Sequence, residues 1–170
     1  GWNALYLENH DQPRAVCRFG DPDNFWYESA TALATAYFLQ RGTPFIYQGQ
    51  EIGMLGGAFS SPTDLRDVES LNALREDAGE EIPPGLAHMS RDNGRTPMQW
   101  DDSANAGFTD ASPWIGVPRS ASQINVAAQL ADDSSVLAYY RALIDARHRI
   151  GAATDGGFTR LDMGDPALFF

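Results

Sequence analysis

Two short apolar runs, each followed at once by polar residues, lie in the first third of the chain. The run Ala4–Leu7 turns polar at Glu8, and the run Pro44–Tyr47 turns polar at Gln48. Short apolar runs without alternation are typical of strands that are buried on both faces, as in a parallel sheet. We therefore predict two such strands, each ending in a cluster of polar side chains.

A helix is predicted between these strands, over Asn24–Arg41. Asp23 or Asn24 is available to cap its start, and Gly42 to end it. The side chains that recur at helical spacing are Trp26, Ala30, Leu33, Ala34, Tyr37 and Phe38. The order strand, helix, strand predicts a βαβ unit and hence a parallel sheet.

The rest of the chain has a different character. Residues Ile52–Asp133 are rich in glycine, proline and aspartate, and the pattern predicts only one brief helix there, over Pro62–Ala78. A connection of this length inside a compact domain is usually functional. Beyond it, Ser134–Arg149 predicts a last helix, and Phe158–Met163 with Ala167–Phe170 predicts an antiparallel hairpin. The side chains expected to face inward from the last helix are Val136, Leu137, Tyr140, Leu143 and Ile144.

Composition narrows the class of protein. The 170 residues are 43% hydrophobic and 21% charged, which is typical of a globular domain and excludes disorder or a collagen-like chain. No apolar run long enough to span a bilayer and no signal-peptide pattern occur, so we expect no membrane partner and a cytoplasmic location. A net charge of −11 opposes binding to nucleic acid. Cys17 is the only cysteine, which excludes an intrachain disulfide and a cysteine zinc site.

The polar cluster after the first strand holds the sharpest candidate chemistry, because Asn9, His10 and Asp11 are adjacent. An imidazole beside a carboxylate at the end of a buried strand is suited to binding sugar hydroxyls, stabilising developing positive charge or ligating a metal. The alternative is that Asn9 and Asp11 only form a turn and that His10 is a surface histidine. Spacing alone does not separate these interpretations.

Three longer motifs extend the pattern and carry a resemblance to a known family. They occupy Leu7–Arg14, Gly42–Met54 and Ser90–Asp101, and shorter matches follow at Asn105–Thr109, Pro113–Ile115 and Tyr139–Arg141. Together they resemble the oligo-1,6-glucosidase and α-glucosidase branch of glycoside hydrolase family 13, the α-amylase family. The motifs occur in the same order as in that family and cover nearly the whole chain.

The resemblance implies an α/β fold, the C-terminal portion of a (β/α)8 TIM barrel. Leu5–Asn9 is then expected to be the seventh barrel strand and Phe45–Tyr47 the eighth, each with its helices. Residues 1–150 are expected to belong to the barrel, and residues 151–170 to begin an antiparallel β domain. Because a piece with two barrel strands has open sheet edges, we expect this chain either to self-associate or to pair with the rest of its barrel.

The activity implied by the resemblance is that of a retaining α-glucosidase. Such an enzyme removes terminal α-1,6- or α-1,4-linked glucose from short gluco-oligosaccharides and uses two carboxylates about 5 to 5.5 Å apart. In the family both carboxylates lie upstream of the first motif, so the 170-residue chain alone is expected to be inactive. Two alternatives remain open: a sucrose isomerase or glucosyltransferase with the same site, and a non-catalytic relative that acts as a binding or transporter subunit.

Three residues of this chain are implied to act on the reacting glucose. Asp11 matches the third family carboxylate, which stabilises the transition state, and His10 is expected to donate to hydroxyls of the same sugar. Arg91 matches an arginine that reaches that glucose, where a guanidinium can hold a carboxylate and a hydroxyl together. Arg95, four residues later, is interpreted as structural and is expected to tie its loop to Asp92 or Asp101.

Other candidates are weaker. Glu69 matches a residue that touches the second sugar in relatives, although an exposed helical glutamate is more often a solvated side chain. Asp101–Asn105 is interpreted as a turn rather than a calcium loop, and no metal or cofactor is expected. Most of the aromatic residues that could stack on a sugar are expected to be packed in the core or in loops instead; they are Phe59, Trp100, Phe108 and Trp114.

Overall fold

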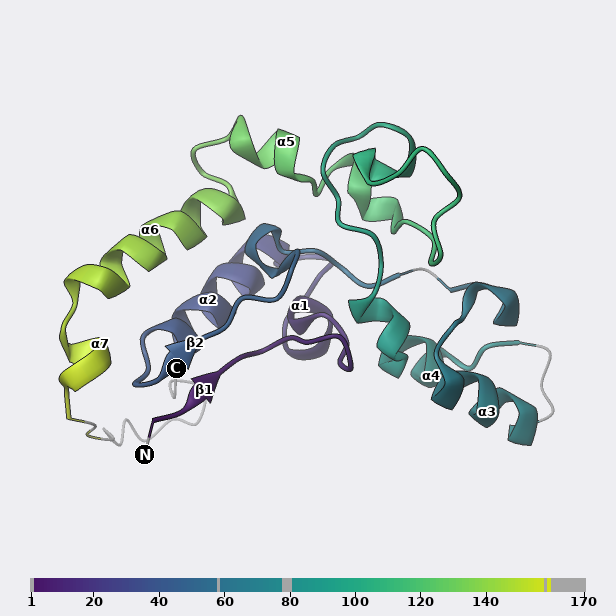
Figure 1. Ribbon diagram of the computed structural model, residues 1–170, viewed down its shortest axis with the longest axis horizontal. Helices are drawn as coiled ribbons and strands as arrows, with labels where there is room; N and C mark the ends of the chain where they lie inside the picture. The colour runs from purple at the N-terminus through teal and green to yellow at the C-terminus, as the bar shows by residue number, and fades with distance from the viewer. Residues whose placement is uncertain (1, 58, 78–80, 158, 160–170) are drawn as a thin grey trace.

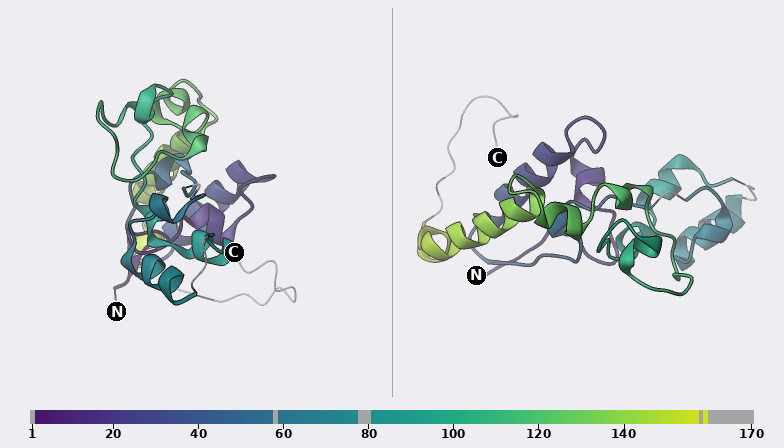
Figure 2. Two further views of the ribbon diagram at one scale, coloured as in Figure 1. Left: turned by 90° about the vertical axis from the view of Figure 1, so that its right-hand side faces the viewer. Right: turned by 90° about the horizontal axis from the view of Figure 1, so that it is seen from above.

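The computed structural model describes residues 2–57, 59–77, 81–157 and 159. The molecule is elongated, with a two-stranded sheet and its covering helices toward one end and two short helices at the other (Figures 1 and 2). Strands β1 (Ala4–Leu5) and β2 (Thr43–Pro44) pair in parallel, with Ala4 opposite Thr43 and Leu5 opposite Pro44. The segment between them carries helices α1 (Ala15–Phe19) and α2 (Trp26–Phe38). The predicted βαβ unit and parallel sheet are therefore confirmed.

The strands differ from the prediction in length and burial. We expected strands over Leu5–Asn9 and Phe45–Tyr47, buried on both faces, whereas the paired residues lie earlier and number two in each strand. Leu5 and Leu7 pack against the helices, but Ala4 is exposed and Tyr6 is 50% exposed. The reason is that β1 and β2 pair only with each other among the described residues, so one face of the sheet is covered and the other is open.

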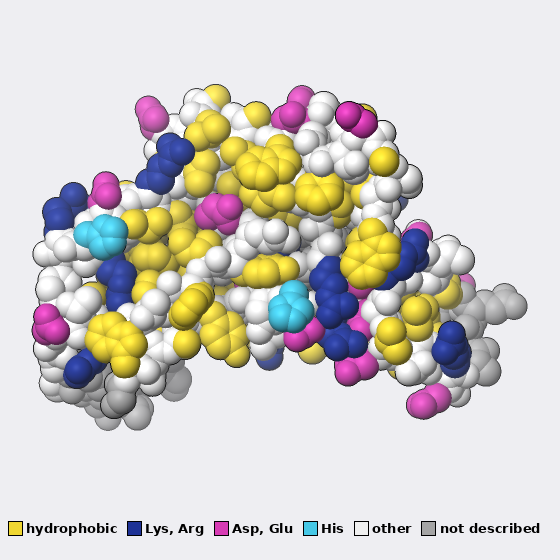
Figure 3. Space-filling model, viewed as in Figure 1, with side chains coloured by type: hydrophobic (Ala, Val, Ile, Leu, Met, Phe, Trp, Pro, Cys, Tyr) yellow, Lys and Arg dark blue, Asp and Glu magenta, His cyan; other side chains and the backbone are white. Residues whose placement is uncertain are grey.

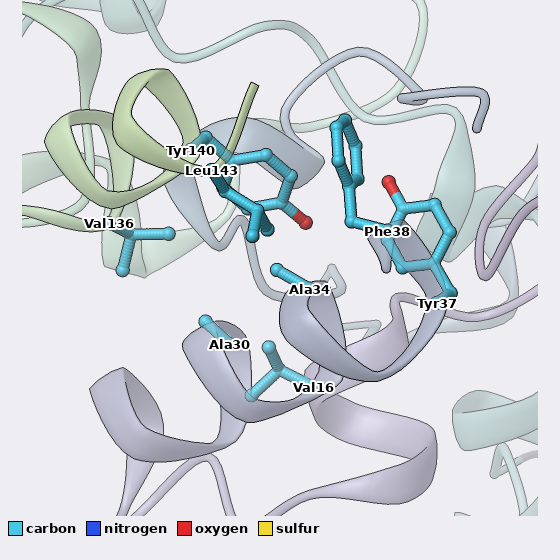
Figure 4. Close-up of a cluster of buried hydrophobic side chains, with 8 residues drawn as sticks. All are labelled: Val16, Ala30, Ala34, Tyr37, Phe38, Val136, Tyr140 and Leu143. Carbon is cyan, nitrogen blue, oxygen red and sulfur yellow. The ribbon is translucent and has the colours of Figure 1, made fainter. Parts of the chain in front are cut away.

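The main hydrophobic core lies between α2 and α6 (Val136–Arg149) (Figure 4). Helix α2 contributes Ala30 and Ala34 and, in its last turn, the rings of Tyr37 and Phe38. Helix α6 contributes the facing stripe, as the helical spacing predicts. Phe38 meets the rings of Tyr37 and Tyr140 edge to face, at centroid distances of 5.2 and 6.2 Å. The buried members are Val16, Ala30, Ala34, Tyr37, Phe38, Val136, Tyr140 and Leu143. This core fixes α6 against the βαβ unit.

Both ends of α2 differ from expectation. Neither Asp23 nor Asn24 caps the helix; instead both donate their backbone N–H groups to Asp21 Oδ1, and this turn delays the first helical residue to Trp26. The helix ends at Phe38 rather than at Gly42. Gly42 instead allows the chain before β2 to approach the start of β1, because an added Cβ there would lie 2.5 Å from the carbonyl oxygen of Asn3.

The long central segment contains more helix than predicted. The single helix expected over Pro62–Ala78 is two elements, the 3-10 turn η2 (Pro62–Asp64) and helix α3 (Val68–Asp77). Leu65–Asp67 between them is not helical, and the N–H groups of Arg66 and Asp67 donate to Asp92 in a later loop. The other short elements are η1 (Gln50–Ile52), α4 (Pro84–Met89), η3 (Arg91–Gly94), η4 (Ala104–Gly107), η5 (Arg119–Ser122) and α5 (Val126–Leu130). Helices α3 and α4 lie side by side, away from α6 (Figures 1 and 2).

The last helix agrees with its prediction apart from two residues at its start. Helix α6 begins at Val136, where the Ser135 hydroxyl accepts the N–H of Ala138 as an N-cap. Near its end, Arg147 is buried and donates to the carbonyl oxygens of Phe38, Gln40 and Gly42, which joins α6 to the segment before β2. A short helix α7 (Ala152–Asp155) follows.

Apart from Thr159, the hairpin expected over Phe158–Met163 and Ala167–Phe170 lies outside the described residues. In the part of the chain that the structure does describe, every helix is too short or too polar to cross a membrane.

Candidate active site

The turn after β1 brings His10 and Asp11 to the carboxyl end of that strand. Asn9 shapes the turn, because its side-chain oxygen accepts the N–H of Asp11 at 2.8 Å and its backbone carbonyl accepts the N–H of Gln12 at 3.4 Å. The side chains of His10 and Asp11 are 70% and 48% exposed. The Asn9 side chain thus stabilises the turn. The His10 imidazole and the Asp11 carboxylate beside it remain accessible to solvent.

Two arginines approach Asp11 from the segment that begins at η3. Arg95 donates Nη2–H to Asp11 Oδ1 at 2.9 Å and Nε–H to the carbonyl oxygen of His10 at 2.8 Å. Arg91 Nη1 lies 3.9 Å from the same Oδ1. His10 Nε2 is 3.2 Å from Asp11 Oδ2. Asp11 therefore has a cationic or polar partner at each oxygen while half of its side chain stays open to solvent.

Arg91 is held mainly by Asp67, just before α3. Its Nε and Nη2 lie 2.8 and 2.5 Å from Asp67 Oδ1, and its Nη1 is 3.7 Å from Glu69 Oε1. Burial of Asp67 opposes its ionisation, but hydrogen bonds from Arg91 and Ser70 outweigh this effect and lower the pKa of Asp67 to about 2. Glu69 is 80% exposed on its side chain and faces the same arginine. The Asp67–Arg91 pair is thus permanently ionic near neutral pH.

Buried polar contacts hold these loops together. Asp92 is fully buried, and its Oδ2 accepts the backbone N–H groups of Arg66 and Asp67 at 2.6 and 2.9 Å. Gly94 packs directly on the turn after β1, since an added Cβ would lie 2.8 Å from the carbonyl oxygens of both Asn9 and Gln12. Any side chain at Gly94 would push the two arginines away from Asp11.

A second acid–arginine pair lies beneath this turn. Arg14 and Glu8 are buried, with Nη1 of Arg14 3.1 Å from Glu8 Oε2 and 2.7 Å from the carbonyl oxygen of Gln48. Glu8 Oε1 also accepts the N–H of Ala15. Burial raises the pKa of Glu8 above its usual 4.5, against the opposite effect of Arg14. This pair ties β1 to α1 and to the end of β2.

The structure brings together all four residues that the sequence analysis selected, which are His10, Asp11, Glu69 and Arg91. The tie expected from Arg95 to Asp92 or Asp101 is wrong, because the guanidinium reaches His10 and Asp11 instead. Asp67 is a site residue that the sequence analysis missed, although it lies only two residues before the candidate Glu69. An aspartate directly before a helix predicts an N-cap, and it does not indicate that the partner of its carboxylate is an arginine.

The aromatic candidates are more exposed than expected. Trp100, Phe108 and Trp114 are 50%, 51% and 65% exposed, so the expectation that they are packed is wrong. Phe59 and Trp114 line a hollow of about 280 Å³ beside Thr63 and Arg66. These loops lie on the surface, where little of the described chain covers their rings.

His10 and Asp11 are residue types that can also ligate a metal. Among the side chains that the structure describes, no group of three or more His, Cys, Asp or Glu is arranged to hold a metal ion. The arrangement instead presents carboxylate oxygens, an imidazole and guanidinium nitrogens to one open surface (Figure 3). Such groups bind neutral polyhydroxylated ligands through paired donors and acceptors.

Comparison with known proteins places this chain in a family. The family described as the alpha-amylase catalytic domain matches residues 1–156. The chain belongs to this family, whose catalytic domain is a TIM barrel. The predicted membership of the α-amylase family is thereby confirmed.

Two relatives match nearly the whole of this chain. An oligo-1,6-glucosidase of Parageobacillus thermoglucosidasius is 47% identical over 99% of this chain, and a trehalose-6-phosphate hydrolase of Escherichia coli strain K12 is 49% identical over 99%. The chain spans 31% of the length of each. A crystal structure of a Bacillus licheniformis trehalose-6-phosphate hydrolase variant superposes with a TM-score of 0.90 at 42% identity, covering 98% of this chain and 31% of that one.

Proposed function

We propose that this chain is part of a longer retaining α-glucosidase that removes terminal α-1,6- or α-1,4-linked glucose from short gluco-oligosaccharides. The observation that carries the proposal is the open cluster of His10, Asp11, Arg91 and Arg95 at the carboxyl end of β1. In barrel enzymes the active site lies at that end of the strands. Family membership and 47% identity to an oligo-1,6-glucosidase support the same reaction class.

In this proposal, residues 1–150 form the C-terminal part of the barrel and residues 151–170 begin a β domain. Strand β1 is the seventh barrel strand and β2 the eighth. Support comes from their parallel pairing and from α6, which packs back on α2 as a barrel helix does. A cytoplasmic location remains the expectation.

We assign the roles within the site as the family resemblance implies, and the contacts around Asp11 and Arg91 support them. Retention needs a nucleophilic carboxylate and an acid, which we place upstream of Gly1. Asp11 accepts hydrogen bonds from hydroxyls of the reacting glucose and stabilises the positive charge that develops on its ring. His10 donates to hydroxyls of the same glucose, Arg91 binds it through Nη1, and Glu69 faces the second sugar.

A substrate panel tests the proposal on the longer protein. We expect glucose release from isomaltose, maltose and an aryl α-glucoside, and no reaction by the purified 170-residue chain alone. Release only from trehalose 6-phosphate would assign the specificity named for the Escherichia coli relative. Isomerisation of sucrose would favour the sucrose isomerase alternative. No turnover on any of these substrates would support a non-catalytic relative and overturn the proposal.

The exposed face of the two-stranded sheet carries large apolar side chains. Tyr6, Phe45 and Ile46 are 50%, 55% and 37% exposed and border an open hollow of about 390 Å³. Figure 3 shows hydrophobic side chains gathered over this region. We propose that the rest of the barrel covers this face in the longer protein, and that the isolated chain self-associates through it. Light scattering of the isolated chain tests this, since a monomer that unfolds cooperatively would contradict it.

A further inference from the structure

We propose that Asp67 is a positioning residue, which grips one edge of the Arg91 guanidinium and so presents the other edge to the substrate. This inference rests on the proposed function, because it assigns a task within the same site. Asp67 itself lies behind Arg91 and is 2% exposed, so it acts through the arginine rather than on the sugar.

Both carboxylate oxygens of Asp67 accept hydrogen bonds from Arg91. Oδ1 accepts from Nε at 2.8 Å and lies 2.5 Å from Nη2, which defines one edge of the guanidinium. Oδ2 accepts the backbone N–H of Arg91 at 3.3 Å and the hydroxyl of Ser70 at 2.8 Å. Side chain and backbone of the arginine are therefore oriented by one buried carboxylate, a geometry that a single-point ion pair does not provide.

The remaining nitrogen of Arg91 is left for a ligand. Nη1 lies 3.9 Å from Asp11 Oδ1 and 3.7 Å from Glu69 Oε1, beyond hydrogen-bond distance of both. Within the described residues it has no hydrogen-bond partner, and the Arg91 side chain is 27% exposed. A hydroxyl between these carboxylates can accept from Nη1 and donate to either one. The preformed orientation lowers the entropy lost when such a hydroxyl binds.

Asp67 is also rigidly placed. Its N–H donates to the buried Asp92, and Ser70 links it to Ser90 through a hydroxyl pair at 3.0 Å. Because Asp67 directly precedes α3 and accepts the N–H of Glu69 at 3.3 Å, a helix cap is the competing explanation. Serine is an equally good cap but is too short to reach Arg91. The substitution Asp67→Ser therefore separates the two roles.

The first test is a double-mutant cycle in the longer protein with an aryl α-glucoside as substrate. We expect Asp67→Ser to lower kcat/KM on the order of tenfold in the wild-type background, and to have little further effect in an Arg91→Ala background. Asp64→Asn is the matched control, because Asp64 also accepts backbone N–H groups beside a helical turn but does not contact Arg91. Equal losses in both backgrounds, or no loss in the first, would overturn the proposal.

The second test does not depend on activity. Arginine modification by phenylglyoxal, followed by peptide mass spectrometry of the longer protein, reports how accessible each guanidinium is. We expect faster modification of Arg91 in Asp67→Ser than in wild type, with the rate at Arg95 unchanged. Unchanged modification of Arg91 would contradict the positioning role. A wild-type protein that fails to hydrolyse the glucoside contradicts the proposed function, and the modification rates then decide the inference by themselves.

Discussion

Two acid–arginine clusters lie next to each other in this protein and have opposite surroundings. Glu8 and Arg14 form a pair whose side chains are 3% and 0% exposed, whereas Asp11, only three residues beyond Glu8, is half exposed beside Arg91 and Arg95. In the buried pair, Arg14 also donates to a backbone carbonyl and lies 5.4 Å from the ring centroid of Tyr47. In the open cluster, hydrogen-bonding atoms still face solvent.

The two clusters share residue types and differ in solvent access, which is what separates the structural ion pair from the proposed binding site. In the buried pair, Arg14 Nη1 and both Glu8 oxygens are bonded to protein groups, and losing one partner leaves the other charge buried and unpaired. An exposed cluster gives up little stability when altered, because water replaces the lost contacts. Its open donors and acceptors are available to a ligand. The following predictions test this distinction.

The largest expected effect is on stability, from Arg14→Met. Removing Arg14 leaves Glu8 buried without its cation, so we expect the free energy of unfolding of the longer protein to fall by about 3–5 kcal/mol. Urea denaturation measures it. Arg95→Met is the matched change in the open cluster and should cost less than about 1 kcal/mol. Equal losses in the two variants would remove the distinction between the clusters.

The next effect is on turnover, from Asp11→Asn. Because Asp11 is proposed to act mainly in the transition state, we expect kcat of the longer protein to fall by about a hundredfold to a thousandfold, with a smaller change in KM. His10→Ala should act in the same direction. Steady-state kinetics on an aryl α-glucoside, together with thermal unfolding, checks both. If Asp11→Asn lowered the unfolding temperature and left kcat unchanged, Asp11 would have a structural role like that of Glu8 and Arg14.

A smaller effect separates the two arginines. Arg91→Lys should raise KM by roughly tenfold, since a single ammonium cannot hold Asp67 and also present a donor to the sugar. Arg95→Lys should lower kcat more than it raises KM, because Arg95 orients the carboxylate of Asp11 and the carbonyl of His10. The split between KM and kcat is the measurement. The reverse split would exchange the roles assigned to Arg91 and Arg95.

The smallest effect is a pH dependence of stability. In the folded protein the pKa of Asp67 is about 2, below its ordinary 3.8. Its ionised carboxylate therefore adds fully to the free energy of unfolding above about pH 4, and this stabilisation is lost as the pH falls through about 2. The pKa of Glu8 is raised instead, so the stabilisation linked to its protonation is lost as the pH rises above 4.5. We expect the difference in unfolding temperature between wild type and Asp67→Ser to shrink with acidification. A constant difference would show that the Asp67 charge adds nothing.

Much of the fold could be predicted because it depends on local patterns. The spacing of apolar residues located α2 and α6 to within about three residues at each end, and the order of elements indicated a parallel pair. Strand limits were less accurate, since a strand exists only where a neighbour supplies hydrogen bonds. The start of α2 was displaced by Asp21, whose side chain competes for the backbone N–H groups of Asp23 and Asn24.

The sequence by itself determined which chemical groups the site contains, through the adjacent His10 and Asp11 and the motif that holds Arg91. Only the tertiary structure decided which partner each group has. Arg95 reaches Asp11 across 84 positions of sequence, and Asp67 grips Arg91 from 24 positions away. Such pairs depend on how closely two loops approach, here through Gly94 and the buried Asp92. Burial has the same origin, because side chains from distant segments cover Glu8 and leave Asp11 open.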